Sequence, residues 1–92
     1  MKNTEQQTLI NYIDYKIENN IDFIDFKQLK DFIIDEYYTA AIYFVENNTS
    51  LKTLFLSFLQ NMQSINNYYE DEYLHQIDEI KTEFFQYLKT LN

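Results

Sequence analysis

The chain has 92 residues and contains neither glycine nor proline. Glycine supplies the positive-φ turns of irregular structure, and proline supplies fixed kinks. A chain that lacks both has little means of building tight β-hairpins or phosphate-binding loops, and it has nothing that breaks a helix from within. We therefore predict an all-α protein whose helices are joined by short, asparagine-rich connections.

Caps and apolar spacing predict four helices. The first begins at Thr4, with Gln7 three residues later as in a capping box, and it ends at Asn19-Asn20. The second begins at an Asp25 cap and ends at Asn47-Asn48. Asparagine tolerates the left-handed backbone that ends many helices, so it replaces glycine at these positions.

The second helix carries two further signals. Ile24 and Leu29 are placed for a hydrophobic staple around the cap. From Tyr37 to Val45 only Thr39 is polar, so this end of the helix is apolar nearly all round. We expect this stretch to hold an exposed patch that contacts a partner.

The third helix begins after a cap at Thr49 or Ser50 and ends at Asn66-Asn67. Lys52 is its only charged residue, which predicts that it is the most enclosed of the four. Asn67 and Glu70 form the expected capping pair of the fourth helix. The run Glu70-Asp71-Glu72 would then lie in its first turn, where the helix dipole favours carboxylates.

The fourth helix has a heptad-like apolar seam, which we expect to pack along a neighbour in the same domain. The seam residues are Tyr73, Ile77, Ile80, Phe84, Tyr87 and Leu91. Short connections make consecutive helices antiparallel. The predicted architecture is a compact antiparallel bundle of four helices, or of three long helices and one short one, in a single domain over residues 1–92.

The net charge is −8, from fifteen acidic residues and seven lysines. Abundant Asn and Ile are typical of an AT-rich phage or bacterial genome, which should also raise the lysine content, so the acidity runs against that trend. If the second and fourth helices are neighbours, their outer faces, from Asp22 onwards, form a carboxylate-rich surface. We predict that this surface contacts a partner through Asp31, Asp35, Glu36, Glu70, Asp71, Glu72, Asp78 and Glu79. An ordinary solvated face is the alternative.

Seventeen aromatic residues exceed the needs of a small core. Tyrosine is enriched at binding hot spots, and several tyrosines fall partly off the apolar stripes. We predict partner contacts for Tyr38, Tyr43, Tyr68 and Tyr69. The alternative is that tyrosines line the rim of the core, with their hydroxyl groups in water.

Catalysis, cofactors and metals find little support in the sequence. There is no cysteine, and the Ser and Thr residues show no pattern of activation. Glu72 and His75 match one Glu-x-x-His step of di-iron bundles, but such sites need two of these motifs and further glutamates. We expect no enzyme activity, no cofactor and no metal site.

Direct nucleic-acid binding is disfavoured, because phosphate contacts need Lys or Arg. No apolar run approaches the ~20 residues that span a bilayer, and the polar N-terminus does not resemble a signal peptide, so we expect a cytoplasmic protein with no membrane contact.

These observations favour a small acidic protein that binds another protein with a basic surface. Our leading hypothesis is an inhibitor, of phage or mobile-element type, that occludes the basic groove of a nucleic-acid-handling protein by placing carboxylates where phosphates would lie. An immunity or antitoxin-like protein that neutralises a toxin is one alternative. A structural homodimer closed by the aromatic residues is the other.

Overall fold

The computed structural model describes residues 2–20 and 25–91, and the side chains of residues 6–19 and 25–91. The described residues form four helices and no strand, as the absence of glycine and proline predicts. The helices are α1 (Lys2–Asn20), α2 (Phe26–Glu46), α3 (Leu51–Tyr68) and α4 (Leu74–Leu91). Asp22 and Ile24, and with Ile24 the predicted staple, lie outside the described residues.

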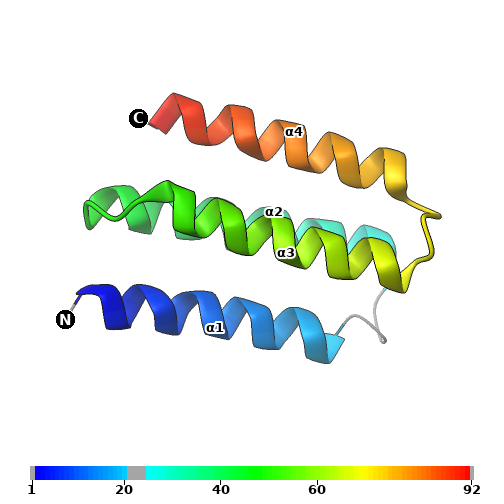
Figure 1. Cartoon of the computed structure of the whole chain (residues 1–92), viewed down its shortest axis with the longest axis horizontal. Coiled ribbons are helices and arrows are strands. Elements are labelled where there is room, and N and C mark those ends of the chain that lie inside the picture. Colours follow the sequence, from blue (N-terminus) through cyan, green and yellow to red (C-terminus); the bar gives the residue numbers. More distant parts are fainter. Residues whose placement is uncertain (1, 21–24, 92) are drawn as a thin grey trace.

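The four helices form a flattened antiparallel bundle. Each helix runs opposite to the one before it, so α2 and α4 both begin at the end that holds the α3–α4 connection (Figure 1). The helices α2 and α3 pack against each other in the middle. The other two lie on opposite sides of this pair, and α1 packs against α2 and α3 but not α4. This arrangement explains principal extents of 38 × 26 × 17 Å.

One continuous hydrophobic cluster joins all four helices. Aromatic rings fill its centre: Phe58 lies with its ring centroid 4.4 Å from that of Phe84 and 5.1 Å from that of Tyr37. The predicted seam of α4 faces this cluster, with its central residues buried and Tyr73, Tyr87 and Leu91 packed at the edges.

Most of the apolar residues at the end of α2 are buried inside the bundle. Because α2 contacts the other three helices, Tyr37 and Phe44 are buried with their neighbours Ala40 and Ala41. Ile42 and Val45 remain exposed. The helix α3, predicted to be the most enclosed, shares the central position with α2.

Two of the predicted caps are confirmed. The backbone N–H of Gln28 donates to Asp25 Oδ1 at 2.9 Å, and that of Lys52 donates to Ser50 Oγ at 3.2 Å. At the end of α2, Asn48 has φ of 56°. The backbone N–H groups of Asn48 and Thr49 donate to carbonyls of the last turn, which is the Schellman pattern with asparagine in the place of glycine.

The predicted cap at Thr4 is wrong, because α1 already begins at Lys2 and Thr4 lies inside it. Gln7 does not reach back to close a capping box. Its Nε2 instead donates to Asn11 Oδ1, one turn further along the helix, at 2.9 Å.

The predicted start of the fourth helix is also wrong. Asn67 lies within α3, which continues to Tyr68, and α4 begins only at Leu74. Glu70, Asp71 and Glu72 therefore lie in the connection before α4 and not in its first turn. The capping pair fails because α3 continues to Tyr68, past the asparagines, and ends in a turn in which Glu70 has the left-handed backbone.

The aromatic centre should dominate stability. Phe58→Ala removes a fully buried ring and should lower the free energy of unfolding by about 3–5 kcal/mol. Phe85→Ala is the matched control, because its ring is 41% exposed and should cost much less. Urea denaturation followed by circular dichroism measures both, and equal losses would contradict this description of the core.

Candidate partner-binding surface

The α3–α4 connection has an uncommon backbone. The N–H of Glu70 donates to the carbonyl of Asn67 and the N–H of Asp71 to that of Asn66, which completes a Schellman motif. Glu70 occupies the position that glycine usually takes, with φ of 52°, and Asp71 follows with φ of 66°. A side chain in this left-handed region costs on the order of 1–2 kcal/mol per residue. The rest of the structure must hold the connection in place.

Packed aromatic rings provide that support. Tyr73, the last residue of the connection, stacks on Phe26 with ring centroids 4.1 Å apart and planes 4° from parallel. Tyr69 meets Phe26 edge-on at 5.7 Å and Tyr73 edge-on at 5.0 Å. Phe26 is buried at the start of α2. This three-ring cluster fixes both ends of the acidic segment against the end of the bundle.

The carboxylates between these rings face solvent. Glu70, Asp71 and Glu72 are all exposed, and so are the flanking Tyr68 (47%) and Leu74 (44%). We call residues 68–74 the acidic tip. It unites five of the residues that the sequence predicts for partner binding, namely Tyr68, Tyr69, Glu70, Asp71 and Glu72.

Other predicted acids lie toward the same end of the bundle. The helices α2 and α4 both begin at that end (Figure 1). Their first halves carry Asp31 and Asp35 on α2, and Asp78 and Glu79 on α4, and all four residues are exposed. In the half of the bundle that holds the tip, the described charged residues lie within residues 14–36 and 70–81. Their described side chains include eleven acids and four lysines, a net charge of −7. In the opposite half, the described charged side chains are Glu46, Lys52, Glu83 and Lys89, which sum to zero.

The acidic surface of α2 and α4 is interrupted at their junction. The two helices are neighbours, which the sequence left open. However, Lys27 and Lys30 line a hollow between them, together with Asp25, Phe26, Tyr73 and Gln76. Two lysines therefore lie beside a carboxylate where α2 meets α4, and the surface there is of mixed charge.

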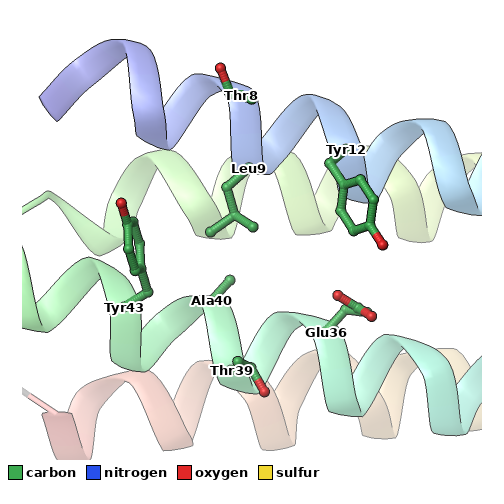
Figure 2. A pocket seen from close by; sticks show the side chains of 7 residues that line it. All are labelled: Thr8, Leu9, Tyr12, Glu36, Thr39, Ala40 and Tyr43. Carbon is green, nitrogen blue, oxygen red and sulfur yellow. The ribbon is translucent and has the colours of Figure 1, made fainter. Parts of the chain in front are cut away.

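The remaining predicted residues lie away from the tip. Tyr38 is half-buried between α2 and α4, where its ring stacks on Tyr87 at 4.4 Å. Burial raises the pKa of the Tyr38 hydroxyl, and the nearby Glu83 carboxylate raises it further. Glu36 and Tyr43 line a groove between α1 and α2 (Figure 2). The structure thus divides the predicted aromatic residues among three places.

His75 lies on the outer face of α4. Its Nε2 is 3.0 Å from Glu79 Oε1, and both side chains are exposed. Glu72 precedes the helix, so the predicted Glu-x-x-His step does not share a helical face. Within residues 2–20 and 25–91, no group of three or more His, Cys, Asp or Glu side chains is placed to hold a metal ion.

Sequence reasoning missed a polar network inside the bundle. Asp14 Oδ1 accepts hydrogen bonds from Asn61 Nδ2 at 2.8 Å and from Ser57 Oγ at 3.3 Å. Asn61 also donates to the Tyr37 hydroxyl. Since the single Ser57 proton goes to Asp14, the Tyr37 hydroxyl donates to Ser57 Oγ, 3.3 Å away.

This network joins α1, α2 and α3 and pairs four polar side chains at their contacts. It does not pair every buried polar group, because the side-chain amide of Gln6 and Oδ1 of Asn66 are buried without a hydrogen-bond partner among the described residues. One signal was present in the sequence: Ser57 and Asn61 interrupt the apolar stripe of α3 one turn apart. Nothing in the sequence, however, placed Asp14 opposite them.

Compared with known proteins, the chain matches no protein-family model, no curated protein and no solved structure. None of the described helices is both long and apolar enough to cross a membrane. Its function must therefore be inferred from the surfaces described above.

The left-handed backbone of Glu70 predicts that glycine at this position stabilises the chain. Glu70→Gly should raise the free energy of unfolding by up to about 1 kcal/mol, because glycine adopts positive φ without the steric cost but loses more entropy on folding. Glu72→Gly, at a residue outside the left-handed region, should not stabilise the chain. Thermal denaturation compares the two, and a destabilised Glu70→Gly variant would contradict the backbone description.

The buried tyrosine predicts a loss of stability at high pH. Burial raises the pKa of Tyr37 to about 12 from 10.0, against the opposing effect of its bonds with Ser57 and Asn61. The unfolded chain therefore loses this proton first as pH rises. The free energy of unfolding should fall between pH 10 and about 12, by up to about 3 kcal/mol, and the titration of Tyr37 should add no pH dependence below pH 10.

Tyr37→Phe isolates this effect, since the other eight tyrosines are common to both proteins. At neutral pH the variant should be about 1–3 kcal/mol less stable, because buried Ser57 and Asn61 lose a partner. Its stability should then fall less steeply above pH 10 than that of the wild type. The free energies of unfolding are measured by urea denaturation at several pH values above 10. If they fell equally steeply with pH in the variant and the wild type, the raised pKa would not belong to Tyr37.

Proposed function

We propose that this chain is a small non-enzymatic protein that binds a basic protein partner through the acidic tip. One observation carries the proposal: three consecutive exposed carboxylates are held between packed aromatic rings, with exposed Tyr68 and Leu74 beside them. Carboxylates supply charge complementarity, and the exposed apolar side chains supply contacts that survive salt.

The charge distribution supports the same proposal. With a net charge of −7 in one half and zero in the other, the molecule presents the tip end to a positively charged surface. Such an arrangement accelerates and orients encounter with a basic partner. The left-handed Glu70 supports it too: the same motif at the end of α2 uses Asn48, whereas here the chain places a carboxylate despite the steric cost.

Within this class, we favour an inhibitor that covers the basic groove of a nucleic-acid-handling protein. The carboxylates of the tip and of Asp78 and Glu79 would occupy positions that phosphates take in the natural complex. Binding would then exclude nucleic acid by occupying its site.

The test compares three proteins. Tagged wild type, the tip variant Glu70→Gln/Glu72→Gln and the control Glu18→Gln/Glu46→Gln are used to capture partners from nuclease-treated lysate of the source cell. Each variant replaces two exposed glutamates by glutamine, but only Glu70 and Glu72 lie in the tip. The partner identified by mass spectrometry is then purified and bound to a labelled oligonucleotide.

Wild type and control should displace the oligonucleotide, and the tip variant should need at least about tenfold more protein, the loss of one charge-assisted contact. Raising the salt from about 0.1 M to about 0.5 M should weaken displacement, because salt screens exposed charges. A partner that the tip variant binds as well as wild type would refute the role of the tip. Capture of a toxin that binds no nucleic acid would favour the immunity hypothesis over inhibition by mimicry.

A further inference from the structure

The groove between α1 and α2 is separate from the acidic tip and has a volume of about 440 Å³. Leu9 of α1 and Ala40 of α2 form its apolar middle, with Tyr43 at one end and Tyr12 at the other (Figure 2). Glu36 lies near the Tyr12 end. Thr8 and Thr39 complete the lining.

Glu36 is the one charged residue in this lining. Its side chain is half-buried, and it forms no ion pair or hydrogen bond with another described residue. A carboxylate beside apolar and aromatic surface attracts a cation more strongly than one in open water, because the local dielectric is lower. The groove therefore has room, apolar walls and a negative charge that no other described residue pairs with.

The Tyr12 ring already lies near a cation. Lys16 Nζ is 5.3 Å from its centroid, within the range of a cation–π contact. The same ammonium group is 5.3 Å from the centroid of Phe32, on the neighbouring helix. Aromatic surface along the α1–α2 junction is thus suited to positive groups.

We propose that this groove binds an arginine side chain that projects from a basic protein partner. The aliphatic stem would lie over Leu9 and Ala40, and the guanidinium group would lie against Tyr12 and pair with Glu36. Arginine fits better than lysine, because its planar group stacks on aromatic rings and pairs with a carboxylate through two hydrogen bonds. The apolar middle of the groove suits its long stem.

This proposal rests on the proposed function only in taking the partner to be a basic protein. It assigns a second contact, made by a different surface, and it can be tested without the partner. The probe is N-acetylarginine amide, titrated into isotope-labelled protein while amide NMR signals are followed. N-acetylcitrulline amide has nearly the same shape but no charge, so it isolates the electrostatic part.

The arginine compound should shift the signals of Leu9, Tyr12, Ala40 and Tyr43, with an apparent affinity at least about tenfold above that of the citrulline compound, as one charge-assisted pair provides. Glu36→Gln should remove this difference. Asp35→Asn is the matched control: it neutralises the adjacent carboxylate, which is exposed and outside the groove. The affinity of Asp35→Asn for the arginine compound should stay within about twofold of that of the wild type, since exposed charges contribute little.

Unchanged affinity in Glu36→Gln, or shifts centred on the tip instead of the groove, would overturn the proposal. The tip variant Glu70→Gln/Glu72→Gln separates the two proposals, because it should bind the arginine compound as wild type does. Failure of the tip variant to affect oligonucleotide displacement would refute the proposed function alone. Failure of Glu36→Gln to affect arginine binding would refute the groove alone.

Discussion

The packing of α2 against all three other helices is the constraint on which the rest of the structure depends. It requires a helix that is apolar on several sides, which Tyr37, Ala40, Ala41 and Phe44 provide. It also leaves α1 and α4 on opposite sides of the central pair, which flattens the bundle. Each outer helix therefore forms its own junction with α2, and the candidate binding features lie at or beside these two junctions.

The middle of the bundle encloses several polar side chains, and four of them pair with one another. Tyr37 reaches the contact between α1 and α3. There its hydroxyl forms hydrogen bonds with Ser57 and Asn61, and both of these residues donate to Asp14. A network in which each donor has an acceptor favours one alignment of three helices over others that would leave these groups unpaired. The same alignment sets α1 beside α2 and so shapes the groove that contains Glu36.

Two surfaces suited to a basic partner arise from different causes. The acidic tip exists because α3 continues to Tyr68 before it ends, because Glu70 in the connection takes the left-handed backbone, and because three aromatic rings hold that connection. The groove exists because small Ala40 lies between larger residues at the α1–α2 junction. The first offers several exposed carboxylates that attract a positively charged partner over a distance. The second offers one half-buried carboxylate beside an apolar groove, where the shape of the bound group also matters.

The sequence by itself determined the class of fold, since a chain without glycine and proline forms long helices whose apolar spacing is local information. It also determined the cap at Asp25, a cap at Thr49 or Ser50, and the end at Asn47-Asn48, because each depends on a few adjacent residues. Only the tertiary structure decided that Glu70, Asp71 and Glu72 lie outside α4, that Lys27 and Lys30 line the α2–α4 junction, and that Asp14 meets Asn61. These outcomes depend on which helices pack together, and packing between distant segments overrides local preferences such as the favourable place of carboxylates in a first turn.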